Sequence, residues 1–491
     1  MELKLQFNPS KTKAIIFAQG NTPDLMKRTP VIKMGNRSIK LESEIMYLGV
    51  VLDNRMTWLP HVLAIRTKCT NLFNALARVA RRNWRLNEEA VITIYEGAFV
   101  PKMTYAAAAW SYAAKKGCII KHLRCAQRMA LLRVTKAFRT ASTEALMVVS
   151  GIPPIDLVLK ERTRTFYYRK GLQAHMEDGD TTYQICELRP MSLELPMTYE
   201  RKSVDIAKEE EEGEYNIFTD GSKLEGRVGS SFVVYENETE ICHEKYRLRD
   251  CCSVHQAEMF AIMKAVEWVA LTRSTNNIVI HTDSRSAIQT LMQFRDISPM
   301  ALEAKKLVRR YNLNMKFKWV KAHVGIIGNE RADALAKEAT EMNIISYDKA
   351  PITYIKRQLR QETVTEWQDQ WTYSEKGRFT FWLLPSIQER LSELAWLPKK
   401  YLITQILTNH CSTKHYLKRI GKTNDSMCEC GGGEQTLEHL INECLKYEQE
   451  QMQLRLFSAD IYGMPTLDLY QLIRNSTLLQ EIKSLLRKVL Y

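Results

Sequence analysis

The sequence of 491 residues has no long apolar segment, and no run approaches the roughly 18 to 20 uncharged residues that a transmembrane helix needs. Its first residues, MELKLQFNPSKTK, also lack the apolar core of a signal peptide. With 45% hydrophobic and 26% charged residues, the composition is that of a soluble globular protein. We therefore expect an intracellular protein, nuclear or cytoplasmic, that does not bind membranes.

Cysteine is scarce as well, with 11 scattered residues, which is too few for a disulfide scaffold of this length. The count is odd, so we expect reduced thiols. Internal repeats are absent, and the only low-complexity segment is the acidic run at residues 209–212. Of the cysteines, only Cys428, Cys430 and Cys444 have a spacing that indicates a further role.

Positive charge is plentiful but unevenly distributed. The formal net charge is +14, and residues 61–140 alone contain 15 Lys/Arg against 3 Asp/Glu. The pattern there is that of amphipathic helices with a basic side, which carries Arg78, Arg81, Arg82 and Arg85. A charged run is most often a solvated face, but an excess over several helices favours a surface that contacts nucleic-acid phosphates.

Changes in pattern divide the chain into five parts. Residues 1–60 alternate like strands, and YLGVVL there reads as a buried hairpin; residues 61–175 are helical and basic; residues 176–213 form a linker that ends in the acidic run. Residues 214–343 contain three strands, then alternating helices and strands, which predicts an α/β domain with a mixed five-stranded sheet. Residues 344–491 are a helical tail.

Four acidic residues in the α/β segment stand where strands end or helices begin: Asp220 in FTDGS, Glu258 in HQAEMFAI, Asp283 in VIHTDSRSA and Asp333 in GNERADALAK. Taken singly, each would most often be a surface acid or a helix cap. Sites in open α/β sheets form at the carboxyl ends of strands, so we expect the four to converge. Gathered carboxylates repel one another unless cations lie between them, and Mg²⁺ is the natural guest. Two such ions about 4 Å apart suit phosphodiester hydrolysis.

Together, TDGS, the AEMFAI helix, TDS after an apolar strand, and WVKAHVGIIGNERADALAK resemble a type 1 ribonuclease H domain. The resemblance implies cleavage of the RNA strand of RNA–DNA hybrids, with two Mg²⁺ ions or substituting Mn²⁺ held by the four acidic residues. RNA would be selected through its 2′-hydroxyls. His323 matches the family's mobile-loop histidine, which assists proton transfer or product release. The chain departs from many relatives in having Lys321-Ala322 before this histidine instead of Pro-Gly.

The segments before this domain resemble a non-LTR retrotransposon reverse transcriptase of the jockey and I-factor kind. NPSKTKAIIF and IMYLGVVLD resemble its last palm motifs and primer-grip hairpin, and residues 61–175 resemble its thumb and connection. The paired aspartates of the polymerase site, which lie upstream of NPSKTK in that family, are not present. We therefore expect no polymerase activity from this polypeptide.

In the tail, Cys428, Cys430, His439 and Cys444 form a C-x-C-x8-H-x4-C pattern. Thiolates and an imidazole at this spacing suit a tetrahedral structural Zn²⁺. Scattered Cys and His residues are more commonly inert, but CECG and LEHLINEC also resemble the zinc-knuckle-like segment that ends similar elements. A zinc site that contacts nucleic acid is the resulting expectation.

Three functions remain open at this point. The leading one is a metal-dependent hybrid ribonuclease whose basic helical region retains the substrate. The second is a catalytically idle nucleic-acid-binding remnant of a retrotransposon. The third is a transposase or integrase of the same fold, although such enzymes use three acidic residues and do not need the GNERADALAK helix with His323.

Overall fold

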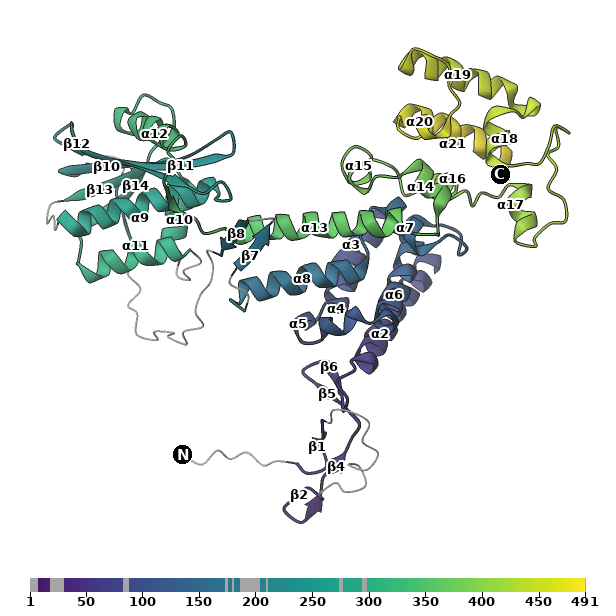
Figure 1. The fold of residues 1–491 in the computed structure, drawn as a ribbon, viewed down its shortest axis with the longest axis horizontal. Helices are drawn as coiled ribbons and strands as arrows, with labels where there is room; N and C mark the ends of the chain where they lie inside the picture. Colours follow the sequence, from purple (N-terminus) through teal and green to yellow (C-terminus); the bar gives the residue numbers. More distant parts are fainter. Residues whose placement is uncertain are drawn as a thin grey trace. The chain divides into compact units, whose positions relative to one another are not determined.

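The computed structural model in Figure 1 describes residues 8–17, 31–82, 88–172, 175–178, 181–185, 204–208, 211–272, 277–293 and 298–490. The chain forms two compact units, one made of Met1–Thr163 with Arg360–Tyr491 and the other of Arg164–Leu359. Within the described residues, no helix is both long and apolar enough to cross a membrane.

The second unit is built on one mixed sheet in the order β15-β12-β11-β10-β13-β14-β9. Its strands are β9 (Asp205–Ile206), β10 (Tyr215–Leu224), β11 (Arg227–Glu236), β12 (Thr239–Leu248), β13 (Ile278–Thr282), β14 (Met315–Trp319) and β15 (Ile345–Tyr347). Strands β10 to β12 form an antiparallel meander, and β13 and β14 continue it in parallel. The sheet is two strands wider than predicted because the short β9 and β15, from outside residues 214–343, pair with its edges.

Helices cover both faces of this sheet, with α12 on one and α9, α10 and α11 on the other (Figure 1). Their bounds are α9 (Val254–Thr272), α10 (Arg285–Met292), α11 (Pro299–Arg310) and α12 (Ile327–Ala339). Successive side chains of a strand point to opposite faces. Phe232 accordingly joins the larger core beneath α9, while its neighbour Val233 packs with Leu335 of α12.

Small residues allow α12 to approach the sheet closely. A Cβ on Gly229 of β11 would collide with the carbonyl group of Ala336. The Ser231 hydroxyl, on the same strand, donates a hydrogen bond of 2.6 Å to the carbonyl oxygen of Ala332. This contact fixes the height of α12 above the strand that neighbours β10.

The segment predicted to be a linker contains local structure where it is described. Strands β7 (His175–Asp178) and β8 (Thr181–Gln184) pair with each other, and β9 joins the main sheet. Glu211, in the acidic run expected to be exposed, forms an ion pair of 2.7 Å with Lys316 of β14. Charge pairing across the sheet edge thus uses a residue that local sequence marks only as repulsive.

The first unit is mostly helical, and one core of buried residues joins its two stretches of sequence. Trp110 and Leu146 from the first stretch share this core with Trp371, Ile403 and Leu479 from the second. The helices of the first stretch are α2 (Leu59–Arg82), α3 (Glu88–Ile94), the π-helix η1 (Tyr95–Phe99), α4 (Val100–Met103), α5 (Ala107–Trp110), the 3₁₀ helix η2 (Ser111–Lys115), α6 (Gly117–Thr135), α7 (Thr143–Ser150) and α8 (Ile155–Arg169).

The helices after the sheet domain continue this unit from α13 (Ile352–Thr372), which, like α8, crosses the boundary between the units. They are α14 (Arg378–Leu383), α15 (Ile387–Leu391), α16 (Tyr401–Thr408), α17 (Lys414–Arg419), α18 (Leu437–Asn442), the 3₁₀ helix η3 (Leu445–Tyr447), α19 (Glu448–Tyr462), α20 (Leu469–Leu472) and α21 (Ser476–Leu490). The thumb-like and tail segments, which sequence patterns separate, therefore pack together.

The N-terminal strands are short: β1 (Lys13–Ala14), β2 (Lys33–Met34), β3 (Arg37–Ser38), β4 (Lys40–Leu41), β5 (Glu44–Tyr47) and β6 (Val50–Asp53). The predicted hairpin is formed by β5 and β6, with Leu48 and Gly49 at positive φ in its turn. The expectation that it is buried was wrong, since Tyr47 is 61% and Leu48 75% exposed. Its apolar pattern reflects strand propensity, and among its strand residues only Val50 and Asp53 are fully buried.

We predict that Gly229→Ala destabilises the second unit, because the new methyl group must push α12 away from β11. Overpacking of this kind costs about 1 to 3 kcal/mol of unfolding free energy. Gly117→Ala is the control, since a Cβ there has no neighbour within 4 Å. Chemical denaturation of both variants measures the effect, and equal stabilities would contradict it.

Candidate functional site

Strand register brings Asp220 and Asp283 together. Strands β10 and β13 are parallel, and their pairing ends with Thr219 opposite Thr282. The two aspartates are the next residue on each strand, so they lie side by side at the carboxyl edge of this pair. Strand β10 itself continues to Leu224 because it stays paired with β11. Asp220 was predicted at the end of a strand, but it lies within one.

Glu258 reaches the same place because helix α9 touches β10 at a glycine. A Cβ on Gly221 would collide with the backbone nitrogen of Glu258, so only glycine allows this approach. The Ser230 hydroxyl of β11 donates a hydrogen bond of 2.8 Å to the carbonyl oxygen of Ala257 and holds the same turn of the helix. The TDGS motif thus supplies an acid and the space for a second acid.

Asp220, Glu258 and Asp283 form a compact cluster, with one carboxylate oxygen from each within 4.8 Å of the others. Asp220 and Glu258 are buried, and Asp283 is partly exposed. The Oε2 atom of Glu258 is buried and has no hydrogen-bond partner among the described residues. Such an unpaired buried oxygen is costly in isolation and is available to coordinate a cation.

The pKa values reflect this crowding. Burial, aided by the charges of Asp283 and Asp333, raises the pKa of Asp220 from 3.8 to about 7. Burial, with the charges of Asp220 and Asp283, also raises the pKa of Glu258 well above its ordinary value. Desolvation and like charges both disfavour the ionised form, and a bound cation would reverse both effects.

Asp333 stands beside this cluster on α12. Its carboxylate pairs with Lys337 at 2.8 Å, and its charge contributes to the raised pKa of Asp220. Helix α12 begins at Ile327, two residues before the predicted start, so Asp333 lies in its second turn. On the same helix, the amide nitrogen of Asn329 lies 3.5 Å from Oδ2 of Asp283.

His323 lies outside the cluster, on the exposed loop between β14 and α12. Its φ of 54° is left-handed, and Gly325, two residues later, has φ 86°. The loop is anchored at its far end, where the backbone N–H of Gly325 donates to Glu330 Oε1 at 3.0 Å. The predicted site therefore consists of an acidic cluster on the sheet and its helices and a histidine on an exposed loop.

The sequence patterns missed one feature beside the acids. The Arg285 guanidinium lies 3.9 Å from the centre of the Trp319 ring, and the Trp319 indole N–H donates to the Asp283 carbonyl oxygen at 2.9 Å. Trp319 is partly exposed although it ends a central strand. The signals available in the sequence were a tryptophan directly before the VKAH loop and an arginine two residues after Asp283.

The basic residues predicted to contact phosphates are not described in full. Arg78, Arg81 and Arg82 belong to α2, but their side chains lie outside the described residues, as does Arg85 altogether. Their role stays a prediction.

The four predicted zinc ligands do meet in the first unit, with one ligand atom from each within 4.8 Å of the others. The Sγ atoms of Cys428 and Cys444 are 3.7 Å apart, and Cys430 Sγ lies 3.2 Å from His439 Nε2. Tetrahedral Zn²⁺ with bonds of about 2.3 Å to sulfur requires sulfur atoms about 3.8 Å apart. The opposite ring nitrogen of His439 lies 3.4 Å from Glu443 Oε2, an arrangement that orients histidine ligands.

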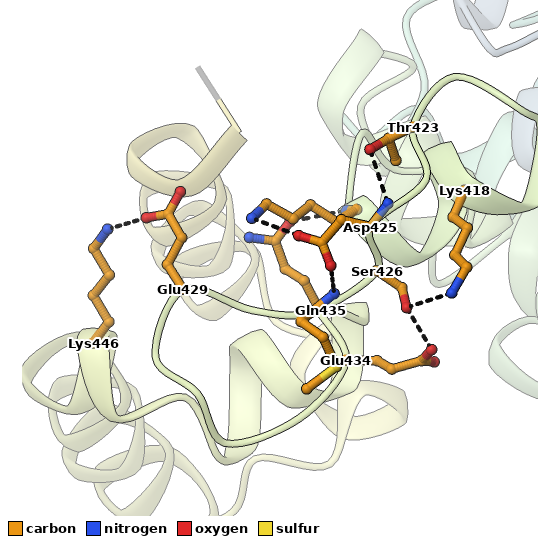
Figure 2. Close-up of polar contacts among 10 residues, drawn as sticks. Lys418, Thr423, Asp425, Ser426, Glu429, Glu434, Gln435 and Lys446 are labelled. Atoms are coloured by element: carbon orange, nitrogen blue, oxygen red, sulfur yellow. Dashed lines mark hydrogen bonds and ion pairs between the residues drawn. The ribbon is translucent and has the colours of Figure 1, made fainter.

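Polar contacts hold the loop that carries Cys428 and Cys430 (Figure 2). The Ser426 hydroxyl accepts from Lys418 at 3.3 Å and donates to Glu434 at 2.7 Å, while Lys446 pairs with Glu429 at 2.6 Å. Gly431, at φ 75°, permits the tight turn between these contacts. Its neighbour Gly432 donates its backbone N–H to Cys430 Sγ, and this lowers the pKa of that thiol to about 6.

Residues 212–341 match the family model described as RNase H. This part of the chain is an RNase H domain. The mixed sheet with helices on both faces is its RNase H-like fold, as predicted from the sequence. The archaeal RNase H1 of Halobacterium salinarum NRC-1, with 21% identity and a TM-score of 0.22, aligns over 26% of this chain and 96% of its own.

The chain is also related to R1 retrotransposon proteins. It is 31% identical over 205 residues to a retrovirus-related Pol polyprotein from the R1 4 element of Nasonia vitripennis, covering 39% of this chain and 50% of that protein. It is 31% identical over 158 residues to a putative 115 kDa protein of element R1DM of Drosophila melanogaster, covering 32% of this chain and 15% of the relative. These alignments span half or less of either relative.

In metal-free buffer at pH 8, we predict that Asp220→Asn stabilises the RNase H domain. The folded-state pKa of Asp220 is raised to about 7, so its carboxylate costs stability as pH rises from about 4 through 7. At about 1.4 kcal/mol per pKa unit, the gain is on the order of 2 to 4 kcal/mol. It should disappear near pH 3, below the ordinary pKa of 3.8, where aspartate is mostly protonated in both states. Thermal unfolding with chelator at both pH values measures this, and a destabilised variant at pH 8 would contradict it.

Proposed function

We propose that the chain is an endoribonuclease that hydrolyses the RNA strand of RNA–DNA hybrids. The observation that carries this proposal is the cluster of Asp220, Glu258 and Asp283 inside an RNase H domain. Three crowded acids, two of them buried, cost folding energy and contribute nothing to packing, so their arrangement is best explained by cation binding. A type 1 enzyme is the finer assignment that the GNERADALAK helix supports.

Asp220, Glu258, Asp283 and Asp333 would hold two Mg²⁺ ions, for which Mn²⁺ would substitute. An all-oxygen set with one unpaired buried oxygen fits a hard cation. When bound, such ions activate water and stabilise the attacking and leaving oxygens of a phosphodiester. Lys337, paired with Asp333, supplies a local positive charge at the edge of the site.

The remaining residues of the site would position the substrate and move protons. The stacked pair of Trp319 and Arg285 offers an aromatic face and a cation beside Asp283, where a sugar–phosphate strand can rest. His323, on its exposed loop, is suited to exchange a proton with the departing 3′-oxygen. Contacts to the 2′-hydroxyl would select RNA.

The second candidate is a catalytically idle nucleic-acid-binding remnant of a retrotransposon. The relatives' names support an origin of this kind. The basic segment with Arg78, Arg81, Arg82 and Arg85 would retain nucleic acid in either case. Turnover alone distinguishes the two candidates. Polymerase activity is not part of either.

We expect the purified chain to cut the RNA strand of a labelled hybrid in Mg²⁺. Loss of an outer-shell partner of a metal site costs about 10- to 100-fold, so loss of a direct ligand in Asp220→Asn should cost more than about 100-fold. Asp348→Asn removes an exposed acid of the same unit and should leave the rate unchanged. No cleavage by the unaltered chain, or equal rates in both variants, would refute the enzyme.

We also propose that Cys428, Cys430, His439 and Cys444 bind one structural Zn²⁺ and that the zinc-bound segment contacts nucleic acid. The sulfur–sulfur separation and the glycine turn support a tetrahedral site. The pKa of Cys430 is lowered and that of Cys444 is raised by burial, so zinc binding would displace a proton from Cys444 and the support for the site is its geometry.

For this site we predict one zinc per chain, lost or strongly reduced in Cys428→Ser. The free energy of metal binding adds to the stability of the folded state, so the same change should lower the melting temperature of the first unit. Cys118→Ser, at an exposed cysteine outside the cluster, is the control. The zinc content of the unaltered chain, Cys428→Ser and Cys118→Ser is measured by metal analysis. An unchanged zinc content in Cys428→Ser would refute the proposed zinc site.

A further inference from the structure

The first unit contains a cavity of about 580 Å³ that none of the functions above uses. It lies where the start of α7, the loop before α14, the end of α16 and α17 come together. Four cationic side chains line it: Arg128, Lys376, Arg378 and Arg419. One acid, Glu144, lines it as well, so the wall carries a net charge of +3.

These cations have no carboxylate partner in the part of the chain that the structure describes. Arg128 donates to the carbonyl oxygens of Arg139 and Ala141, and Arg378 to those of Trp371 and Thr372. These bonds orient the guanidinium groups and leave their charge unneutralised. Arg128 and Arg378 are partly buried, Lys376 and Arg419 are exposed, and all four line one cavity, so the cavity is suited to a negatively charged group.

Backbone groups add to this preference. Helix α7 begins at Thr143 in the cavity wall, and the N–H groups of a first helical turn favour anions. Gly377, at φ 69°, places its Cα so near α7 that a Cβ would lie 2.8 Å from the Ser142 hydroxyl oxygen. This close approach holds the neighbouring Lys376 and Arg378 at the helix start.

His410 also lines the cavity but is not one of its cations. Burial and the charge of Arg419 lower its pKa to about 4, so the ring is neutral at physiological pH. Its Nδ1 lies 3.0 Å from the Thr140 hydroxyl, and its ring stacks on Tyr416. The imidazole therefore serves as a polar and aromatic part of the wall.

A second cavity, also of about 580 Å³, adjoins the first and shares Phe379, Asn409 and Arg419 with it. Here the wall is aromatic, with Phe379 and Trp382 packed edge to face at 5.5 Å and Tyr416 nearby. Trp382 is 49% exposed, which is unusual for so large an apolar ring. The charges in this wall balance, with Arg419 and Arg455 against Glu438 and Asp468.

We propose that the two joined cavities bind a single-stranded nucleic-acid segment, with a phosphate in the cationic cavity and a base against Trp382 in the aromatic one. Cations that follow a backbone, combined with aromatic faces for bases, are the features that bind single strands. A duplex, whose major groove alone is about 12 Å wide, does not enter cavities of this volume. The site is formed by the first unit only and does not depend on the acidic cluster or its activity.

The test measures binding of fluorescent 12-nucleotide RNA and DNA strands to the full chain by anisotropy at several salt concentrations. Lys376→Gln with Arg419→Gln should weaken binding about tenfold and reduce the salt slope by about 0.7, because single strands lose about 0.7 per phosphate contact and the cationic cavity holds one phosphate. Lys422→Gln with Arg487→Gln removes the same charges from exposed positions outside both cavities and is the matched control.

Trp382→Leu separates stacking from charge. It should weaken binding about tenfold with an unchanged salt slope, whereas Tyr373→Leu, at an 85% exposed aromatic outside the cavities, should have no effect. Loss of affinity in the cavity variants for RNA, DNA or both supports the proposal. The strand that binds more tightly, RNA or DNA, identifies the preferred sugar. Equal losses in cavity and control variants would overturn it, as would equally tight binding of inorganic phosphate or a phosphopeptide. Thermal unfolding and zinc content confirm that each variant is folded.

Discussion

In the RNase H domain, carboxylates that repel one another are held close together by backbone packing of the strands and the helix that carry them. Parallel register sets Asp220 beside Asp283, and the absence of a Cβ at Gly221 admits Glu258. The hydroxyl of Ser230 and the close approach at Gly229 fix the helices on either side. The sheet thus stores electrostatic energy at one edge, where a cation would release it.

The acidic cluster is surrounded by residues of differing exposure. Two of the three clustered acids, Asp220 and Glu258, are buried, while His323 and Trp319 are exposed. In the proposed enzyme, a substrate strand would bind and leave at these exposed residues without moving the buried acids. The proposed chemistry, which needs precise placement, and the proposed product release, which needs motion, would then depend on different elements.

The first unit combines two features proposed to bind nucleic acid that lie far apart in the sequence. Its core joins helices from before and after the RNase H domain, so the Cys/His cluster and the cationic cavity belong to one folded body. The near-neutral RNase H domain lacks the basic excess of this body. Retention of substrate would then fall to the helical unit, and cleavage to the sheet unit.

Much of the candidate site could be predicted from the sequence. Short motifs around Asp220, Glu258, Asp283 and Asp333 carry both the acid and the local structure that presents it, since strand and helix signals are local. The C-x-C-x8-H-x4-C spacing likewise placed four ligands near one another. Errors arose where contacts beyond the local motif decided the outcome: β9 and β15 join the sheet from outside the predicted domain, β10 continues past Asp220 because it stays paired with β11, and the hairpin turn at Leu48 is exposed.

The sequence by itself determined which residues carry the chemistry, because acids, cysteines and their spacing are written locally. Only the tertiary structure decided what surrounds them: the unpaired oxygen of Glu258, the stack of Arg285 on Trp319, and the cavity that gathers Arg128, Lys376 and Arg419. Those three cavity residues come from segments up to 291 positions apart. No local sequence pattern predicts that these residues lie close together, because only the packing of the shared core brings their segments together.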